Sequence, residues 1–432
     1  MMTAEENRLL TSTEPGTGCG ALLRRYWQPV ALSEELKPGG APLPVRFFGE
    51  DLVLFRDDRG RPGLLNIHCC HRGADLSYGR VEDGGLRCIY HGWLYDVDGN
   101  CLDQPGEPGG GPHRDAVRQP AYPCQERVGV IFAYFGGGEP PLLRNFEFLA
   151  ASPAHVFVSK IYHECNFLQA NEGNIDPVHL SFLHRNLQES ERDRQRVVRG
   201  GNSSPNSLFG RDIAPTLDVE LTEFGVRIYT TRRMPDDKTY LRVSYFVMPN
   251  FSAFPGQTGG DGYSINWHVP VDDTHHWKFV FVYSRSKPIS REVALRDRSE
   301  MTGDYRLVRN KANRYLQDRD MMRDKSFSGI GFNFQAQDLC VTEGEGPVQD
   351  RTREHLATSD KAIVAARKLI LSAIRDVQDG GEAPSVRRDA ESNRFPEMAV
   401  LSEVVPASVP IKEHTRQRVE EMVVQLSPSL RP

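Results

Sequence analysis

Short apolar runs separated by glycine and charged residues fill the chain from residue 45 to residue 139. The stretch VRFFGEDLVLFRDDRGRPGLLNIHC contains two β-rich runs with glycine at the breaks, and RVGVIFAYFG contains another. In WLYDVDGNCLD, Asp98 and Gly99 stand between two further runs, a position in which Asp-Gly favours a tight hairpin. This pattern predicts a small all-β domain. A helix at about residues 16–26 should precede it, and a Gly/Pro-rich loop at residues 105–113 should interrupt it.

The predicted elements become longer after about residue 142. A strand is predicted in AHVFVSKIYHECN and a helix in LQANEGNIDPVHLSFLHRN, which follows it. The polar segment 189–206, rich in Asn, Ser and Arg, is expected to be mobile. Later runs alternate apolar and polar residues, as strands of an antiparallel sheet with one buried face do. These runs are residues 217–234, 239–254, 263–271 and 275–284.

An amphipathic helix is predicted near the C-terminus. In SDKAIVAARKLILSAIRDVQDGG the apolar residues recur at helical spacing, with Ser359 as a candidate N-cap and Gly380 as a candidate stop. The residues beyond it are rich in Pro, Arg and Glu and predict a partly ordered tail. Together these elements predict an α+β protein. We expect a helical N-terminal segment (1–44), an all-β domain (45–141) and a larger domain (142–432) whose antiparallel sheet is flanked by helices.

Composition and charge narrow the class of protein. Hydrophobic residues make up 39% of the 432 residues and charged residues 26%, an ordinary globular balance. The net charge of −5 gives no reason to expect a nucleic-acid partner. No apolar run approaches the roughly 20 residues that span a bilayer, so no membrane contact is expected. The N-terminal stretch MMTAEENRLLTSTEPG lacks the basic and apolar regions of a signal peptide, which predicts a cytoplasmic protein.

One short segment concentrates residue types that bind metals. HCCHRGADLSYGRVEDGGLRCIYHGW contains Cys69-x-His71 and, sixteen residues later, Cys88-x-x-His91. Two loops that each supply a thiolate and an imidazole could hold a tetrahedral zinc ion. They could equally hold a Rieske [2Fe–2S] cluster, in which two His replace two Cys on one iron. The tight Cys-x-His spacing favours the cluster, because its two residues ligate different irons and need not converge on one atom.

The remaining residues of this segment have other expected roles. Gly73 and Gly92 would allow the backbone to approach inorganic sulfur closely. His68 and Cys70 fit neither ligand pair, and we expect them to be structural.

The segment resembles the Rieske motif of aromatic ring-hydroxylating and demethylating oxygenases in CCHRGADL and CIYHGWLYDVDGNC. The resemblance implies that Cys69, His71, Cys88 and His91 ligate a [2Fe–2S] cluster. The family usually has proline at the position of Cys70, so this chain has a thiol beside the cluster in place of a rigid ring.

A second motif fits a mononuclear iron. A Rieske cluster transfers single electrons, so an oxygenase also needs an iron with open positions, which two histidines and one carboxylate can hold. Asp176, His179 and His184 in NEGNIDPVHLSFLHR form Asp-x-x-His-x4-His, which matches the mononuclear-iron motif of the same family. His179 and His184 lie about 140° apart around an ideal helix, so both reach one iron only where the helix bends or ends. We therefore predict irregular backbone at residues 182–184.

The carboxylate ligand must come from elsewhere in the chain. FNFQAQDLCVTEGEGPVQDRTREHLATSD resembles the C-terminal segment of phthalate-dioxygenase-type enzymes, in which the aspartate of QD ligates iron. The resemblance therefore implies Asp338 as the third ligand. Glu343, Glu345 and Asp350 are expected to be solvated surface charges.

Asp176 has two possible roles. In related oxygenases the equivalent aspartate bridges a Rieske histidine of one subunit to an iron-ligating histidine of the next. Asp176 would then join His91 of the partner subunit to His179, which implies a head-to-tail trimer, in some cases stacked as a hexamer. The alternative is a helix N-cap with Pro177 as the first helical residue.

The resemblance also implies a reaction. The chain would be the oxygenase component, which uses O₂ to hydroxylate or O-demethylate a small aromatic acid or aryl ether. No flavin or nicotinamide motif is evident, so electrons would come from a separate NADH-dependent flavin and iron–sulfur reductase. The alternatives are a Rieske electron carrier without oxygenase activity and a zinc-stabilised binding module.

Several further residues are candidates for the pocket or for the scaffold. Arg242, in YLRVSYFVMPNF, occupies a position where such enzymes hold a substrate carboxylate; alternatively it is a surface strand residue in a charge pair. A second matching arginine is not evident, which favours a single-carboxylate or phenolic substrate over phthalate. Glu172 and Asn174 are expected near the iron pocket, and His163 and Cys165 are expected to be strand residues.

Overall fold

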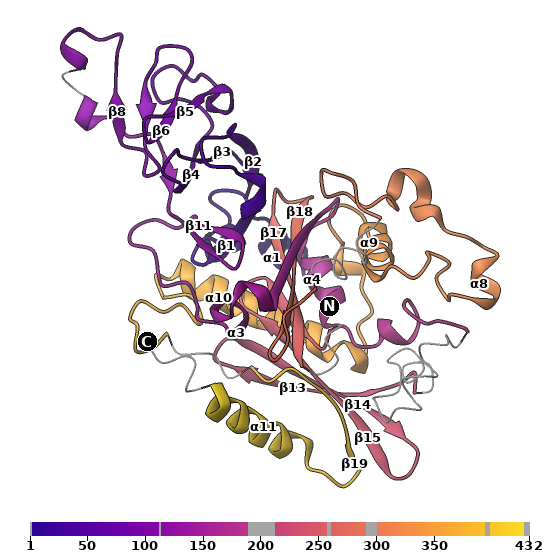
Figure 1. Cartoon of the computed structure of the whole chain (residues 1–432). Coiled ribbons are helices and arrows are strands. Elements are labelled where there is room, and N and C mark those ends of the chain that lie inside the picture. Colours follow the sequence, from indigo (N-terminus) through magenta and orange to yellow (C-terminus); the bar gives the residue numbers. More distant parts are fainter. Residues whose placement is uncertain are drawn as a thin grey trace.

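The computed structural model describes residues 2–111, 114–188, 212–256, 261–290, 300–393 and 398–426. The polar segment at residues 189–206 lies outside these ranges. Helices and antiparallel sheets both occur in the described part of the chain (Figure 1), so the predicted α+β class is confirmed.

Two short helices open the chain. The first, α1 (Ala4–Thr11), was not predicted from the sequence, and it begins with a capping box. The Thr3 hydroxyl accepts from the Glu6 amide at 3.1 Å, and the Glu6 carboxylate accepts from the Thr3 amide at 2.9 Å. The second, α2 (Gly18–Leu23), confirms the helix predicted near residues 16–26 and ends before strand β1.

Three small antiparallel sheets form the N-terminal β region. The predicted Asp98–Gly99 turn joins β7 to β8, with φ of +78° at Gly99. The sheet with β5 to β8 lies at one extremity of the molecule (Figure 1). The strands are β1 (Trp27–Leu32), β10 (Cys124–Arg127) and β11 (Val130–Tyr134); β2 (Leu43–Phe47), β3 (Glu50–Arg56), β4 (Pro62–Asn66) and β9 (Ala121–Tyr122); and β5 (Arg80–Glu82), β6 (Gly85–Arg87), β7 (Leu94–Tyr95) and β8 (Cys101–Asp103).

The predicted antiparallel sheet forms the centre of the second half, and it has eight strands because the runs 217–234 and 239–254 each divide into two and a strand from the C-terminal tail joins them. Its order is β12 (Val156–His163), β18 (His276–Ser284), β17 (Gly262–Pro270), β16 (Phe251–Phe254), β15 (Lys238–Val247), β14 (Gly225–Met234) and β13 (Thr216–Thr222), with β19 (Leu401–Pro406) paired to β15. The expectation of one solvated face is wrong for the central strands. Every residue of β17 is buried, including Ser264, Asn266 and His268. The polar positions of the alternating pattern therefore point into the protein.

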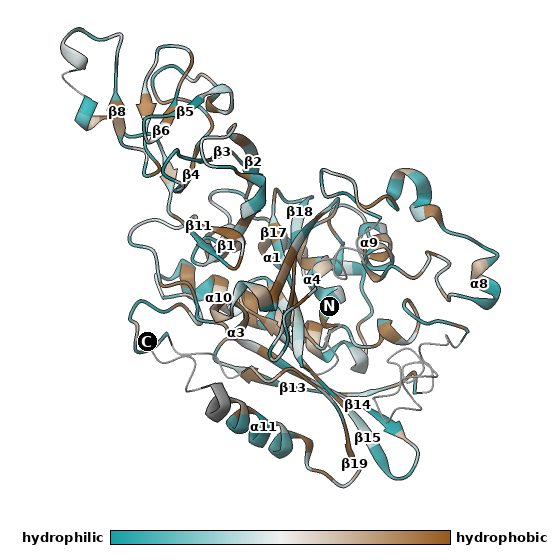
Figure 2. Ribbon diagram, viewed as in Figure 1, coloured by the Kyte–Doolittle hydropathy of each residue, from teal (hydrophilic) through white to brown (hydrophobic). Residues whose placement is uncertain are grey.

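Helices cover the sheet and close the chain. The amphipathic helix is α10 (Lys361–Gln378), and Gly380, with φ of +86°, follows the C-cap residue Asp379, as predicted for a stop. Its N-cap is Asp360, one residue after the predicted Ser359. In Figure 2 the described part of α11 is largely hydrophilic. The other helices are α3 (Glu147–Ala150), α4 (Phe167–Ile175), α8 (Met321–Asp324), α9 (Phe334–Gly344) and α11 (Ile411–Leu426). Short 3₁₀ turns are η1 (Ser33–Glu35), η2 (Leu76–Tyr78), η3 (Pro108–Gly110), η4 (Arg114–Ala116), η5 (Pro153–His155), η6 (His179–Ser181), η7 (Lys311–Leu316), η8 (Arg351–Arg353) and η9 (Thr358–Asp360).

Backbone hydrogen bonds join the two halves. The amides of Phe48 and Gly49, at the β2–β3 turn, donate to the carbonyls of Pro270 and Val271 at 3.0 and 2.8 Å. A continuous apolar core includes Phe47 and Phe132 from the first half and Trp267 from the second. Within the described ranges, none of the helices combines the length and apolar character that crossing a bilayer requires.

Candidate metal centres

The first four predicted ligands meet at the tip of the N-terminal β region. Cys69 and His71 lie in the loop after β4, and Cys88 and His91 lie between β6 and β7. The two cysteines are each 3% exposed, whereas the two histidines are only half-buried, with ring centroids 4.5 Å apart. Two inner thiols and two outer imidazoles fit a [2Fe–2S] cluster whose histidine-ligated iron faces outward.

The two ligand loops share one backbone feature. In each, a glycine amide donates to the carbonyl of the ligand cysteine: Gly73 to Cys69 at 2.7 Å, and Gly92 to Cys88 at 3.0 Å. Both glycines have positive φ, +74° and +79°, which other residues rarely adopt. The glycines therefore permit the tight turns that bring each cysteine and histidine to the same side.

Two aromatic residues that the sequence analysis missed support this site. The Trp93 ring stacks on His71 at 4.3 Å with an interplanar angle of 3°. The Tyr95 hydroxyl lies 3.1 Å from Sγ of Cys69 and 3.4 Å from Sγ of Cys70. A hydroxyl that donates to a ligand thiolate stabilises its charge. The signal was present in the sequence, because both residues directly follow the Cys88–His91 loop.

The second motif lies where α4 ends. Asp176, with φ −87° and ψ 108°, is the C-cap of this helix, so its reading as an N-cap is wrong. The 3₁₀ turn η6 follows at His179–Ser181, and Phe182 departs from helical geometry with φ −124° and ψ −71°. Irregular backbone between His179 and His184 is therefore confirmed. It begins earlier than expected, at Asp176.

Three predicted iron ligands converge here. The ligand atoms of His179, His184 and Asp338 all lie within 4.8 Å of one another. Oδ1 of Asp338 lies 3.0 Å from Nε2 of His184 and 4.0 Å from Nε2 of His179. Asp338 comes from α9, which packs against α4 and so joins segments more than 150 residues apart. Two imidazoles and one carboxylate are the donor set of a mononuclear iron with open positions.

Neighbouring groups fix the ligands and their charge. The Nδ1–H of His184 donates to Oε1 of Gln337 at 2.6 Å, which leaves Nε2 for a metal. Burial lowers the pKa of His179, which favours the neutral, ligating imidazole. Burial also lowers the pKa of His184, but the charge of Asp338 outweighs it and the net direction is upward. Burial raises the pKa of Asp338, but the charge of His184 and its hydrogen bond outweigh it, and the pKa stays below its usual range. The carboxylate is therefore ionised at neutral pH.

Asp176 lies beside this group. Its Oδ1 accepts from the amide of Val178 at 2.7 Å, and its Oδ2 lies 3.8 Å from Nδ1 of His179. Asp176 is half-buried, and the side chain of His179 is 20% exposed. One carboxylate oxygen is thus fixed by the backbone, and the other faces the imidazole from the side opposite to Asp338.

Glu172, expected near the iron pocket, belongs to a buried ion-pair network. It is buried between two arginines, with Arg351 Nη2 at 2.8 Å and Arg367 Nε at 2.6 Å. Burial raises the pKa of Glu172, but the two guanidinium groups lower it by more than burial raises it. The pKa of Glu172 therefore lies below its usual range. The expected pocket residue therefore has a structural role.

Glu172→Gln is expected to lower the free energy of unfolding by about 3–5 kcal/mol, because it removes the carboxylate charge that pairs with the two buried arginines. Since the folded-state pKa of Glu172 is depressed, its contribution is present above the ordinary glutamate range and is lost as pH falls through the lower folded-state value. Urea unfolding at neutral and acid pH measures both effects. The exposed pair partner Glu421, changed to Gln, is the control and should cost less than about 1 kcal/mol.

Glu343, Glu345 and Asp350, the other three acidic candidates, differ in burial. Glu343 is buried, so its surface assignment is wrong: its carboxylate accepts from the Tyr315 hydroxyl at 2.5 Å and from the Glu164 amide at 2.8 Å. Glu345 and Asp350 are exposed, as expected.

Arg242 and Asn174 are both half-buried and lie on or against the sheet near the second motif. Arg242 lies on the face of β15 that also carries Tyr240, whose ring packs against Leu180 in η6. Asn174, in the last turn of α4, accepts from Ser252 at 3.4 Å and from the Asn266 side chain. The sheet face beneath His179 is therefore lined by polar side chains.

Comparison with known proteins agrees with this geometry. Residues 26–123 match the family model "Rieske [2Fe-2S] domain", and residues 133–429 match "LigXa C-terminal domain like". The phthalate 4,5-dioxygenase oxygenase subunit of Pseudomonas putida is 36% identical over 91% of both chains. The 5,5'-dehydrodivanillate O-demethylase oxygenase subunit of Sphingobium sp. is 30% identical over 91% of this chain and 85% of its own.

A solved structure supports the same fold. The oxygenase of carbazole 1,9a-dioxygenase, in its reduced complex with ferredoxin, has a TM-score of 0.58 at 19% identity and covers 90% of this chain and 99% of its own. These findings favour an oxygenase over a pure electron carrier and exclude the zinc-module alternative, because the first centre lies in a Rieske domain and a complete second domain follows it. Enzymes of this kind work with a reductase or ferredoxin, O₂ and an aromatic substrate, and their cofactors are a [2Fe–2S] cluster and a mononuclear iron. The chain belongs to the Rieske non-heme iron aromatic-ring oxygenases and is an oxygenase subunit of the phthalate-dioxygenase type.

Proposed function

We propose that the chain hydroxylates or O-demethylates an aromatic substrate with one carboxylate or phenolic group, at an iron held by His179, His184 and Asp338. The observation that carries the proposal is the convergence of these three side chains from α9 and the segment after α4. We assign Cys69, His71, Cys88 and His91 as the cluster ligands. The cluster supplies single electrons, and the iron supplies coordination positions for O₂ beside the substrate.

Arg242 is the proposed contact for the substrate's anionic group. It is half-buried on β15, its guanidinium donates to the Pro255 carbonyl at 3.4 Å, and no carboxylate of the described residues lies within 4.0 Å of it. Burial lowers the pKa of Arg242, which reflects the cost of holding this charge out of water. A substrate carboxylate would offset that cost by a bidentate, charge-assisted hydrogen bond.

Arg242→Gln is expected to raise KM for a carboxylated aromatic substrate by about 10- to 100-fold, because one ionic hydrogen bond is lost. The value of kcat should change much less, since the bond forms before the chemical step. Steady-state kinetics separate the two constants. Arg233→Gln, an exposed position on the neighbouring strand β14, is the matched control and should leave KM unchanged. Equal loss for charged and uncharged substrates would contradict the assignment.

We propose a head-to-tail ring of three chains. The β5–β8 sheet and helix α9 lie far apart in one chain (Figure 1), so electrons have a short path only across a subunit contact. Exposed apolar residues flank both centres: Ile89 and Tyr90, 61% and 56% exposed, beside the cluster, and Phe182, Phe327, Phe332 and Phe334 beside the iron ligands. Two such patches on one chain can cover each other in a ring.

Asp176 would then connect the two centres. With one oxygen held by the Val178 amide, the other can accept from His179 and from His91 of the partner subunit. This contact would orient both imidazoles and couple their protonation.

A separate NADH-dependent flavin and iron–sulfur reductase is the proposed electron donor, in the cytoplasm. All eight cysteines are free of disulfides, as a reducing compartment would keep them.

The test of function is a substrate panel. Holoenzyme, a competent reductase and ¹⁸O₂ are incubated with benzoates, phenols, methoxybenzoates and phthalate, and products are identified by mass. We expect labelled hydroxylated products, or demethylated products with formaldehyde release, from mono-anionic or phenolic compounds. Steady product formation from phthalate would refute the narrower substrate claim. Absence of both ¹⁸O-labelled hydroxylated products and demethylated products from every compound would refute the function.

A further inference from the structure

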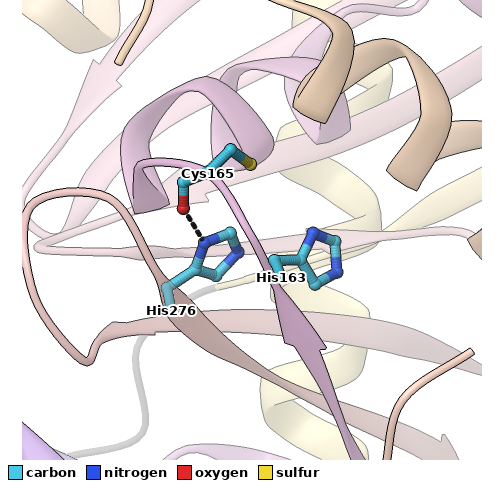
Figure 3. A group of neighbouring side chains, drawn as sticks. All are labelled: His163, Cys165 and His276. Atoms are coloured by element: carbon cyan, nitrogen blue, oxygen red, sulfur yellow. Dashed lines mark hydrogen bonds between the residues drawn. The ribbon is translucent and has the colours of Figure 1, made fainter. Parts of the chain in front are cut away.

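A third group of metal-ligand side chains lies at the base of α4. His163 ends β12 and is the cross-strand partner of His276, the first residue of β18. Cys165 follows two residues later, just before α4 begins (Figure 3). One ligand atom from each of the three lies within 4.8 Å of the other two. The side chains are buried, at 1%, 0% and 0% exposure for His163, Cys165 and His276.

His163 is incompletely satisfied. Neither of its ring nitrogens has a hydrogen-bond partner among the described residues, although both are buried. A neutral imidazole always carries one N–H donor and one lone pair, and buried polar groups are nearly always paired. The arrangement therefore lacks a group that would engage the lone pair of His163.

His276 is oriented as a metal ligand would be. Its Nδ1–H donates to the Cys165 carbonyl at 2.7 Å (Figure 3), which leaves the lone pair on Nε2. Ligand histidines commonly donate their other ring N–H to a backbone carbonyl in this way. Nδ1 of His268 lies 3.0 Å from Nε2 of His276, so its N–H donates to that lone pair, and Nε2 of His268 has no hydrogen-bond partner among the described residues. A zinc ion on Nε2 of His276 would replace this hydrogen bond.

Burial favours the neutral form of both imidazoles in this group. Burial and the nearby Lys278 lower the pKa of His163, and burial lowers that of His276 to about 3, so both imidazoles are neutral. Burial raises the pKa of Cys165 and the positive charge of Lys278 lowers it only in part, so the thiolate would form only with a compensating cation.

We propose that His163, Cys165 and His276 bind one zinc ion. One thiolate and imidazole nitrogens are zinc donors, and burial of the ligands is typical of a structural site. Binding would transfer the Cys165 thiol proton to solvent and form the zinc–sulfur bond. The ion would join β12, β18 and the start of α4, the helix that leads to Asp176 and His179.

The test is the metal content and zinc coordination of the holoenzyme purified from zinc-supplemented cells. We expect about one zinc per chain besides the iron, with one sulfur and otherwise nitrogen ligands in the zinc X-ray absorption spectrum. Cys165→Ser and His276→Gln should each remove most of this zinc, whereas Cys124→Ser, a cysteine on β10, should retain it. Absorbance of the Rieske cluster reports folding of each variant.

Zinc that had replaced iron at His179, His184 and Asp338 would show no sulfur ligand. In Asp338→Ala, which removes that competing site, the sulfur-ligated zinc should remain. Absence of zinc after exposure of the holoenzyme to excess Zn²⁺, zinc without a sulfur ligand, or equal zinc in folded Cys165→Ser, His276→Gln and Cys124→Ser proteins would overturn the proposal.

Discussion

Replacement of Asp338 by alanine is expected to remove the mononuclear iron and abolish oxygenation while the Rieske cluster stays intact. Asp338 supplies the only carboxylate that lies with both His179 and His184 in the described part of the chain. Two imidazoles alone hold ferrous iron weakly, so iron should fall from about three to about two per chain. Product formation should fall at least about 1000-fold. Metal analysis, cluster absorbance and product formation measure the three quantities.

Asp350→Ala is the matched control for this variant. Asp350 is an exposed aspartate twelve residues further along the chain, where its side chain caps a short 3₁₀ turn. It should keep three irons and full activity. Retention of the third iron and of activity in Asp338→Ala would remove Asp338 from the site.

Asp176→Asn is expected to lower turnover by about 100-fold while both metal centres stay loaded. The amide keeps an oxygen for the Val178 backbone, but it cannot accept from two imidazoles as a carboxylate can. The loss should therefore lie in electron transfer from cluster to iron. Stopped-flow oxidation of the reduced cluster, in the presence of substrate and O₂, measures that step directly.

Asp320→Asn controls for the loss of one negative charge, because Asp320 is a surface residue whose side chain is 82% exposed. It should leave the rate of cluster oxidation unchanged. Loss of iron from Asp176→Asn would instead indicate a ligand role, and an unchanged rate would exclude Asp176 from the electron path.

Features that depend on residues close together in the chain were predicted correctly from the sequence. Cys69, His71, Cys88 and His91 lie in two tight loops whose glycines are visible in the sequence. His179 and His184, five residues apart, could not both reach one iron from a regular helix, and the structure has a 3₁₀ turn and non-helical backbone there. Strand alternation likewise predicts the antiparallel sheet. It cannot tell which face is solvated, and here the polar face lies inside.

The expected roles of Glu172 and Glu343 were not found because each residue pairs with residues distant in the sequence. Glu172 is buried because Arg351 and Arg367, almost 200 residues away in sequence, neutralise it. Glu343 is buried with Tyr315 for a similar reason. No local pattern contains such partners. Asp338 was predicted only from the family resemblance, because its distance along the chain from His184 does not indicate whether the two residues meet in space.

The histidine and cysteine group at the base of α4 shows the same limit. His163 and Cys165 look like ordinary residues at a strand end. They become a candidate site only because the register of β12 and β18 places His276 opposite His163. A sequence-based signal would have required that register.

Activity of mixed rings tests the central claim most directly, namely that the cluster of one chain serves the iron of the next. Cys88→Ser chains lack the cluster, Asp338→Ala chains lack the iron, and each alone should be inactive. Co-expressed at equal levels, three quarters of random three-chain rings contain both kinds of chain, and each such ring has one competent contact of three. We therefore expect about a quarter of wild-type activity per chain. Isolated mixed rings that remain as inactive as either parent would contradict transfer between subunits.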